Sequence, residues 1–501
     1  MIVYLLLLSL FLFLYWWKNL EEERKKLPPG PLPLPIFGNL LQLDPSGPQK
    51  TVVKWSKQYG PVLTIWIPKP VVLVTDFNLI KEALVKNADV YAGRYLGFVF
   101  TMYADDAMGN GIILSEGPRW KDQRRFSLHV LRNFGLGRNI MEAKIMEESD
   151  RFMEAVSKAV GPGGQAVLDL EVDIHLCVGN IINNLIMGKG FAKDDPSFFK
   201  LKSMLEDEFR EVSSLKMMLL DKYPWLRHLP IAGGFGYKNY WDYARKIQIF
   251  LEKQIEEHKK EFRMDDEPTD FCHAYLKEME KRKKAGEDMG YFTETQLRNV
   301  LGDLWAAGME TTVTTLRWGI AFMLHHPEIQ KKVQDEIDEK LGDRPVSMRD
   351  RTSMPYTAAT VQEVQRAANI FPFNLQHKTT QDTWLGGHLI QKGTTVIPQI
   401  SSVHTDPTLF PSPDKFNPDR FLEADGKTLR KVEQLIPFSL GKRMCLGESL
   451  ARMELFLIFS SLLQKFSLAV PDGQTAPNLQ PIVGITLVPR KYQCLVTQRK
   501  H

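Results

Sequence analysis

One stretch decides how this chain folds: Phe438-Ser-Leu-Gly441-Lys-Arg443-Met-Cys445-Leu-Gly447. A thiolate can hold haem iron only from a loop whose backbone passes close to the porphyrin, and glycine permits both the approach and the unusual dihedral angles. Gly441 and Gly447 suit those two requirements. Backbone N–H groups that converge on the sulfur stabilise its charge, and an aromatic ring such as Phe438 can shield it from water. The stretch therefore predicts a haem site in which Cys445 ligates the iron and Arg443 neutralises a propionate.

A buried structural cysteine in a glycine turn is the alternative interpretation. The chain has 28 Phe, 34 Gly and 4 Cys in 501 residues. With this composition, the five fixed positions would occur together by chance on the order of once in ten thousand such chains. The stretch resembles the signature Phe-x-x-Gly-x-Arg-x-Cys-x-Gly of the cytochrome P450 haem-thiolate monooxygenases, and the match at this loop is complete.

The resemblance to the microsomal, drug- and steroid-oxidising animal enzymes of this family spans nearly the whole chain. It implies a mainly α fold, with a large helical domain, a long central distal helix and a small β-rich N-terminal subdomain. It also implies haem b as the cofactor, with the sulfur pushing electron density onto the iron.

The composition is that of one large globular unit with a balanced charge. Hydrophobic residues make up 44% of the chain, and 64 basic against 60 acidic side chains give a net charge of +4. This balance argues against a nucleic-acid partner. The four cysteines are too widely spaced for a structural zinc site or a disulfide scaffold, which points to a reducing compartment. They are Cys177, Cys272, Cys445 and Cys494.

The N-terminus has the features of a membrane anchor. Residues 1–17 are apolar except for Ser9, and as a helix they would span roughly 25 Å, slightly less than an average bilayer core. Basic side chains follow this run and none precedes it, so the positive-inside rule places the rest of the chain in the cytosol. A cleaved signal peptide is the alternative, but a basic n-region and a small-residue cleavage site are missing.

These features divide the chain into three parts. We expect a transmembrane signal anchor at 1–17, a charged and Pro-rich linker at 18–35 and a catalytic domain at 36–501. Prolines in series stiffen the linker, so it should act as a semi-rigid spacer. Together with the resemblance, the anchor predicts the endoplasmic reticulum membrane, with the catalytic domain facing the cytosol. An apolar region at 215–240 fits membrane contact and core packing equally well.

A helix of over thirty residues is predicted from Thr293 to His326, where Pro327 stops it. Thr293-Glu-Thr-Gln296 has the pattern of a capping box. Near its middle, the stretch Ala306-Ala307-Gly308-Met309-Glu310-Thr311-Thr312 is unfavourable for a regular helix, so we expect a bulge that admits water. The stretch resembles the Ala-Gly-x-Glu/Asp-Thr motif of the family. The resemblance implies that Glu310 and Thr311 deliver protons for oxygen activation.

Three charged residues resemble the Glu-x-x-Arg pair of the family with its downstream arginine. Glu363 and Arg366 share one face of a predicted helix at 357–368, and Arg420 follows in Phe416-Asn-Pro-Asp-Arg-Phe. The resemblance implies a buried triad that locks the region before the cysteine loop. Because a buried unpaired charge is costly, loss of one member should prevent stable haem incorporation.

The haem propionates need partners, and the resemblance supplies candidates. Trp120 and Arg124 are i, i+4 neighbours on a predicted helix and can both donate to a carboxylate. Arg94 and His377 match propionate-binding positions of the animal enzymes, although a surface charge for Arg94 and a histidine with satisfied hydrogen bonds for His377 are equally good explanations. Lys378 is expected to be solvated.

By the same resemblance, the substrate pocket has apolar walls from separate segments, which favours a lipophilic substrate such as a xenobiotic, a steroid or a fatty-acid-like compound. The predicted wall residues are Ile113, Ala307, Phe371, Leu375, Ile482 and Val483.

Electrons must come from another protein, because the chain lacks a flavin fingerprint, a nucleotide-binding loop and an iron-sulfur cysteine set. The resemblance implies NADPH–cytochrome P450 reductase, so that NADPH acts indirectly, and it admits cytochrome b5 as a further partner. Basic side chains near the haem motifs suit an acidic flavoprotein, although a solvated face explains them slightly better. They are Lys121, Arg124, Arg125, Lys431, Lys442 and Arg443.

The sequence therefore predicts a membrane-anchored monooxygenase that inserts one atom of O2 into an apolar compound. Two other classes of function stay open. A haem-thiolate isomerase or dehydratase that rearranges a peroxide needs no reductase and no proton delivery, so the Glu310-Thr311 pair argues against it. A non-catalytic haem carrier or sensor would keep the cysteine loop but would need no apolar cavity.

Overall fold

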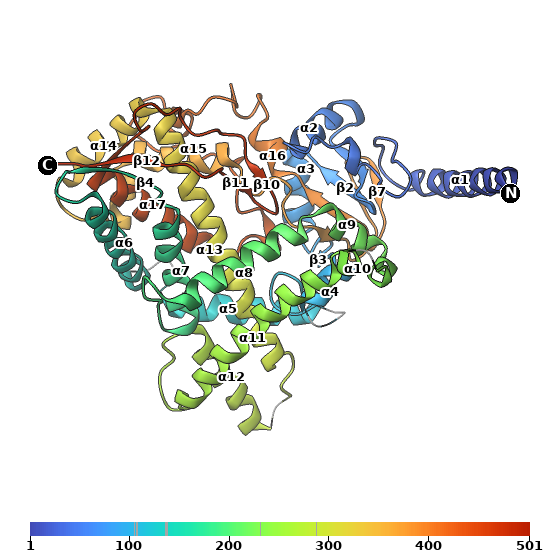
Figure 1. Cartoon of the computed structure of the whole chain (residues 1–501), viewed down its shortest axis with the longest axis horizontal. Coiled ribbons are helices and arrows are strands. Elements are labelled where there is room, and N and C mark those ends of the chain that lie inside the picture. The colour runs from blue at the N-terminus through green and yellow to red at the C-terminus, as the bar shows by residue number, and fades with distance from the viewer. Residues whose placement is uncertain (105, 107–108, 136–138, 231, 287, 501) are drawn as a thin grey trace.

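The computed structural model describes all residues except 105, 107–108, 136–138, 231, 287 and 501. Helices form most of the described chain, and the strands gather in small sheets, as the sequence predicted (Figure 1). The α-helices are α1 (Ile2–Arg24), α2 (Pro48–Tyr59), α3 (Phe77–Lys81), α4 (Phe98–Ala104), α5 (Gly117–Asn133), α6 (Asn139–Val160), α7 (Glu171–Met187), α8 (Pro196–Val212), α9 (Leu215–Lys222), α10 (Ala232–Phe235), α11 (Tyr237–Glu261), α12 (Phe271–Ala285), α13 (Glu294–His325), α14 (Pro327–Leu341), α15 (Pro355–Ala368), α16 (Ile400–His404) and α17 (Glu448–Lys465).

Short helical turns connect several of these elements. They are η1 (Leu40–Gln42), the π-turn η2 (Glu82–Lys86), η3 (Pro224–His228), η4 (Met348–Thr352), η5 (Pro418–Phe421) and η6 (Gly441–Arg443).

The largest sheet joins the N-terminal part of the chain to segments near the cysteine loop. It has five strands in the order β1 (Val62–Trp66), β2 (Pro70–Val74), β8 (Thr395–Pro398), β5 (His377–Lys378) and β3 (Gly93–Arg94). The predicted strands near residues 61–67 and 71–75 are therefore confirmed, because they form the antiparallel pair β1 and β2. At the other edge, β3 and β5 place Arg94 opposite His377.

Three smaller sheets complete the β structure among the described residues. One holds β4 (Gln165–Leu168), β12 (Cys494–Gln498) and β9 (Phe466–Ala469), in that order. The others are the pair β6 (Thr383–Leu385) and β7 (His388–Ile390) and the pair β10 (Ile482–Val483) and β11 (Leu487–Val488).

Helix α13 runs through the centre of the molecule, as the sequence predicted. It begins after Thr293, whose hydroxyl accepts a hydrogen bond from the Gln296 N–H at 3.1 Å, and it ends before Pro327. The predicted capping box is only half formed, because the Gln296 side chain instead bonds both backbone groups of Gly111. Most of the second half of α13 is buried against α7, α15 and α17, which explains why its composition is apolar nearly all round.

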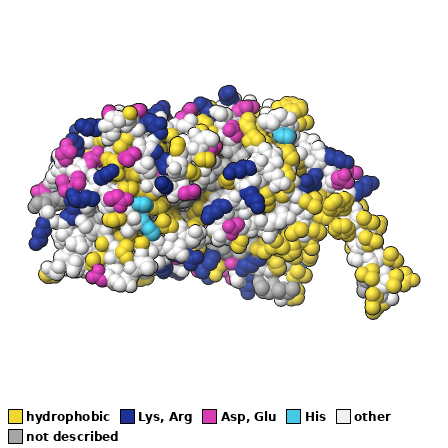
Figure 2. Space-filling model, turned by 90° about the horizontal axis from the view of Figure 1, so that it is seen from above, with side chains coloured by type: hydrophobic (Ala, Val, Ile, Leu, Met, Phe, Trp, Pro, Cys, Tyr) yellow, Lys and Arg dark blue, Asp and Glu magenta, His cyan; other side chains and the backbone are white. Residues whose placement is uncertain are grey.

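The N-terminal helix α1 projects from the body (Figures 1 and 2). At 23 residues it is about 35 Å long, enough to cross a bilayer core. It continues past the predicted boundary at residue 17 because the charged stretch 18–24 stays helical. At its end, the Arg24 guanidinium donates to the carbonyl oxygens of Gly30 and Pro31, at 3.1 and 3.0 Å.

The Pro-rich segment that follows lies against β1. The Thr64 N–H donates to the Pro29 carbonyl at 2.8 Å, and a Cβ on Gly30 would come within 1.9 Å of the Thr64 carbonyl oxygen. The end of the anchor helix is therefore tied to the catalytic body through backbone contacts.

A buried ion triad joins α15 to η5. Glu363 and Arg366 are 0% and 1% exposed and form two hydrogen bonds, of 2.7 and 2.8 Å. Arg420 approaches the same carboxylate at 3.1 Å. The remaining guanidinium N–H groups donate to carbonyl oxygens, among them those of His404 and Pro411, so that every buried charge has partners.

Replacing Glu363 with Ala should leave two buried guanidinium groups without their carboxylate. We expect a loss of roughly 3–5 kcal/mol in the free energy of unfolding and a severe drop in the yield of folded, haem-loaded protein. Urea unfolding and the haem absorption per mole of protein measure the two effects. Glu339→Ala is the matched control, since Glu339 pairs with Lys340 on the surface. A Glu363→Ala protein with the wild-type urea midpoint and haem content would contradict the structural role of the triad.

Candidate haem-thiolate site

The cysteine loop is held in one conformation by close backbone contacts. Gly441 has φ +75°, and a Cβ there would lie 1.8 Å from the Leu84 carbonyl oxygen, so no other residue fits. The Cys445 N–H donates to the Phe438 carbonyl at 2.9 Å and closes the loop. Gly447 has an ordinary φ of −88° and caps the N-terminus of α17. Its missing side chain leaves space beside the sulfur, because an added Cβ would meet only Cys445 Sγ, at 4.0 Å.

Cys445 differs from the other three cysteines, all of which the structure describes: they are buried and it is exposed. Protein nevertheless surrounds its sulfur closely enough that burial raises the pKa of the thiol. The backbone N–H groups of Gly447 and Glu448 and the charge of Arg124 act in the opposite direction and stabilise a thiolate. The loop therefore presents an accessible sulfur at a helix N-terminus, which is what a metal ligand requires.

Three arginines gather beside the loop. Arg443 is buried, donates to the carbonyl oxygens of Ala92 (2.9 Å) and Ser115 (2.7 Å), and lies 3.8 Å from the centroid of the Trp120 ring. Burial, together with repulsion from Arg94 and Arg124, lowers the pKa of Arg443 to about 8. Burial and Arg124 likewise lower the pKa of Arg94 to about 10. Positive charge thus exceeds negative charge among the side chains of this arginine cluster.

The same region contains an unpaired buried donor. The indole N–H of Trp120, on α5, has no partner among the described residues although it is fully buried. Half-buried Arg124, one turn further along α5, donates to the Met444 carbonyl at 2.7 Å. A buried N–H and an excess of guanidinium charge fit a group with two carboxylates, as haem has in its propionates. Trp120, Arg94, Arg124 and Arg443 would hold them.

His377 lies next to this cluster, on β5. Its Nδ1 donates to the Tyr91 carbonyl at 2.8 Å, and Arg94 donates to the Ile113 and Gln376 carbonyls, at 3.0 and 2.8 Å. Burial lowers the pKa of His377 to about 3, so the imidazole is neutral. The expectation for Lys378 is wrong, because its ammonium pairs with Glu116 at 2.8 Å instead of being solvated.

The opposite wall comes from the middle of α13. The helix is regular through residues 306–312, so the expected bulge is absent from this described stretch. Gly308 serves packing instead: an added Cβ would lie 2.5 Å from Ile182 Cδ1 on α7. The Thr311 hydroxyl donates to the Ala307 carbonyl at 2.7 Å.

Glu310 is half-buried and hydrogen-bonded. It accepts from the Thr314 hydroxyl at 3.3 Å. Burial raises the pKa of Glu310, Thr314 opposes the shift, and the charge of Glu206 adds to it. A carboxyl group in this environment can take up and release a proton closer to neutral pH than an exposed glutamate can.

One cavity is lined both by residues of the cysteine loop and by residues of α13. Thr311 and Thr312 of α13 face it from one side, and Phe438 of the cysteine loop and Leu455 of α17 face it from the other. Of the predicted substrate-pocket residues, Phe371 lines this cavity. Ile113 and Leu375 are half-buried, and the exposed members of the set are Ala307, Ile482 and Val483.

No sequence pattern identified two residues that support the site, His404 and Asp303. The His404 Nε2 accepts a hydrogen bond from the Ile436 N–H at 3.0 Å, just before the cysteine loop. On α13, one Asp303 carboxylate oxygen accepts the N–H groups of Ile112 and Ile113, at 2.6 and 2.9 Å, and so fixes the segment that reaches the arginine cluster. Both partners lie far away in the sequence, so spacing could not have revealed them.

Comparison with known proteins gives a family for this geometry. The family model described as cytochrome P450 matches residues 28–496. Cytochrome P450 2B4 of Oryctolagus cuniculus is 38% identical over 98% of this chain and 98% of that protein. Cytochrome P450 2D3 of Rattus norvegicus is 38% identical over 96% of this chain and 94% of its own length, and cytochrome P450 2J1 of Oryctolagus cuniculus is 39% identical over 99% and 96%.

The His404 contact predicts acid sensitivity. Burial, and secondarily the charge of Arg366, lowers the pKa of His404 from 6.5 to about 3. The ring is therefore neutral and its Nε2 can accept from the Ile436 N–H. Below pH 6.5 the unfolded chain binds this proton and the folded chain does not, so stability is lost at about 1.4 kcal/mol per pH unit. In His404→Gln, an amide oxygen that does not titrate can accept instead. The slope between pH 6 and pH 4.5, measured by urea unfolding, should flatten by roughly that amount.

His129→Gln is the control, because His129 is exposed. The assignment would be wrong if both variants kept the wild-type slope, or if both flattened it equally.

Proposed function

The chain belongs to the cytochrome P450 family and is a monooxygenase, and on this premise we propose that it inserts one atom of O2 into a lipophilic small molecule. The other oxygen atom is reduced to water with electrons that originate from NADPH. The main support is that Cys445, the exposed cysteine, lies at the N-terminus of α17, while Thr311 of α13 lines a cavity that Phe438 of the cysteine loop also lines. A thiolate on one side and a hydroxyl on the other is the arrangement that oxygen activation by haem needs.

Each part of the site has a separate task. Bound haem would supply the iron at which O2 is activated. Cys445 would hold the iron, and Phe438 and Leu455, which line the cavity, would exclude water from it. Trp120, Arg94, Arg124, Arg443 and, with its neutral ring, His377 orient the propionate edge.

Protons reach the cavity from α13. The Thr311 hydroxyl already donates to Ala307, so it offers its lone pairs to a proton donor in the cavity. Burial raises the pKa of Glu310, which suits it to exchange protons, and its carboxylate accepts from Thr314 rather than Thr311. Transfer from Glu310 to Thr311 therefore passes through water or requires the carboxyl group to rotate.

The proposed substrate class rests on the apolar side chains of the predicted pocket residues. Phe371 lines the cavity, and we propose that the substrate contacts it together with the other predicted wall residues. They are Ile113, Ala307, Leu375, Ile482 and Val483. An apolar wall offers few hydrogen bonds, which favours lipophilic compounds over polar metabolites.

The electron donor is proposed to be a membrane-bound, NADPH-dependent flavoprotein reductase that docks on the cysteine side. Four of the six candidate basic residues are exposed: Lys121, Arg125, Lys431 and Lys442. Arg443 and Arg124 instead serve the interior of the site. Lys442 is partly neutralised because it pairs with Asp89.

We further propose that α1 anchors the protein in the endoplasmic reticulum membrane with its catalytic domain in the cytosol. Its length and composition suit a membrane span, and basic residues follow it. In the region 215–240, core packing explains some residues and membrane contact explains others. Met217, Leu219 and Leu220 are buried in the protein. Leu215 and Trp225 are exposed and can contact the lipid surface.

Cys445→Ser tests the proposed iron ligand. A serine oxygen cannot give the electron donation of a thiolate, so the reduced, carbon monoxide-treated variant should lose the strongly red-shifted Soret band of the wild-type protein. Absorption spectroscopy on purified protein measures it. Cys494→Ser, at a buried cysteine of β12, should keep the band. A folded wild-type protein that binds haem without this band would refute the haem-thiolate assignment.

Thr311→Ala distinguishes monooxygenation from isomerisation of a peroxide. With reductase, NADPH and a lipophilic substrate, removing the hydroxyl should raise hydrogen peroxide released per NADPH severalfold and lower product formation, because proton delivery fails. Thr360→Ala is the matched control, because the Thr360 hydroxyl on α15 also donates to a main-chain carbonyl four residues earlier, at 2.8 Å. Unchanged coupling in Thr311→Ala, combined with turnover of an organic peroxide without NADPH, would favour an isomerase.

A further inference from the structure

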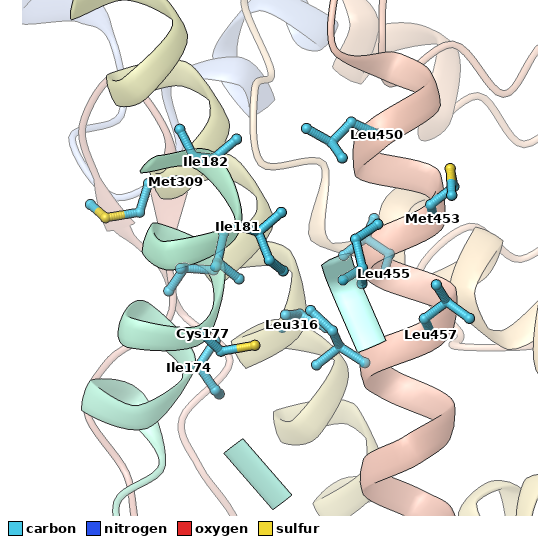
Figure 3. Packing of buried hydrophobic residues seen from close by; sticks show 14 of the residues in the cluster. Ile174, Cys177, Ile181, Ile182, Met309, Leu316, Leu450, Met453, Leu455 and Leu457 are labelled. Atoms are coloured by element: carbon cyan, nitrogen blue, oxygen red, sulfur yellow. The ribbon is translucent and has the colours of Figure 1, made fainter. Parts of the chain in front are cut away.

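A buried acid on α17 has no part in the site described above. Glu454 is 1% exposed and lies on α17, which packs against α13 in an apolar cluster that also includes residues of α7. Its sequence neighbours Met453 and Leu455, and Leu457 further along, belong to the apolar packing between these helices (Figure 3). No lysine, arginine or histidine among the described residues forms an ion pair with it. A carboxyl group buried in such surroundings costs free energy unless hydrogen bonds satisfy it.

Glu454 has one specific partner. The Thr312 hydroxyl on α13 donates to Glu454 Oε2 at 2.9 Å, whereas Oε1 is buried with no partner among the described residues. Burial raises the pKa of Glu454 to about 8, and the Thr312 bond opposes the shift. Cys177 of α7 lies close enough that Glu454 and Glu148 of α6 both help to raise the pKa of its thiol. Among the described residues no positive charge pairs with Glu454, which favours its neutral acid form at pH 7.

The two bonded residues lie on the two helices that carry the reacting groups. Thr312 directly follows Thr311, and both line the cavity. Glu454 is on the helix that begins at Glu448, three residues after Cys445, and its neighbour Leu455 lines the same cavity. Besides the apolar contacts, the Thr312–Glu454 bond is therefore a directional link between the wall that carries the hydroxyl and the wall that carries the sulfur.

Apolar packing alone leaves the relative position of two helices less sharply defined. Side chains such as Leu316, Leu455 and Leu457 can slide past one another at small cost, because dispersion contacts are not directional. A hydrogen bond in a buried, low-dielectric interface has a preferred length and angle. The bond at Thr312 thus fixes both the register and the separation of α13 and α17.

We propose that Glu454 is a positioning residue: its hydrogen bond to Thr312 sets the distance between the Thr311 hydroxyl and the Cys445 sulfur across the cofactor. The inference rests on the proposed function, because the distance matters for reaction only if haem lies between the two groups. The link itself is a property of the protein and can be measured without turnover.

Three variants test the link. Glu454→Leu and Thr312→Val remove the hydrogen bond with little change in volume, and Glu454→Gln keeps an acceptor for Thr312 while matching the neutral acid. In the haem-loaded full-length protein, amide hydrogen exchange of residues 308–316 should become at least about tenfold faster in the first two variants and stay at the wild-type rate in Glu454→Gln. With reductase, substrate and NADPH, hydrogen peroxide per NADPH should rise severalfold in the same two variants, while the KM for substrate stays unchanged.

Gln464→Leu is the matched control. Gln464 is also buried on α17, but it donates to the carbonyl oxygens of Gly342 and Arg344 at 2.8 and 2.9 Å, in a different part of the fold. Its loss should lower overall stability without changing exchange at 308–316 or coupling. Thr312→Val keeps the volume of threonine, so it provides the measurement if Glu454→Leu does not fold.

The outcomes separate the two proposals. Unchanged exchange and coupling in Thr312→Val, or equal changes in Gln464→Leu, would overturn the positioning role. So would a Glu454→Gln protein that behaves like Glu454→Leu. If the wild-type protein lacked the red-shifted carbon monoxide band, the proposed function would fail, whereas the exchange data would still decide whether Glu454 and Thr312 link the helices.

Discussion

The structure depends on holding the backbone that precedes Cys445 in one conformation. A continuous series of contacts does this: the Glu363 carboxylate binds Arg366, Arg366 donates to the His404 carbonyl at 3.0 Å, and the His404 ring accepts from Ile436. Ile436 precedes the loop that the bond between Cys445 and the Phe438 carbonyl closes. The Glu363 carboxylate therefore constrains the position of the sulfur, because each contact in the series is a directional hydrogen bond in a buried environment.

The second constraint is electrostatic. Several guanidinium groups and the Trp120 indole N–H are buried together without enough anionic partners, which lowers the pKa of Arg443 to about 8. Such an arrangement is costly in the protein alone and favourable once two carboxylates are present. Binding of haem and stability of the fold are thus linked, since a ligand that binds only the folded state stabilises it. Arg124 has two effects. Its guanidinium donates to the Met444 carbonyl and so supports the loop, and its positive charge favours the thiolate form of Cys445.

The distal wall combines a rigid helix with a few polar contacts. Helix α13 stays regular at the position where a bulge was expected, and Gly308 allows it to approach α7 closely. In the proposed function, this rigidity would keep Thr311 at a constant distance from bound haem. Asp303 connects the same helix to Ile112 and Ile113, and Glu454 connects it to α17. One helix therefore positions the hydroxyl, the edge of the arginine cluster and the cavity wall.

The sequence by itself determined the family, the cysteine loop, the long helix and the apolar N-terminal segment, because each depends on residues that are close together along the chain. Only the tertiary structure decided the roles of Gln296, Gly308, His404 and Glu454, whose partners are Gly111, Ile182, Ile436 and Thr312. These partners are distant in the sequence, so no local pattern marks them. A buried polar residue obtains its function from whatever the fold places opposite it, and that placement is set by packing of the whole chain.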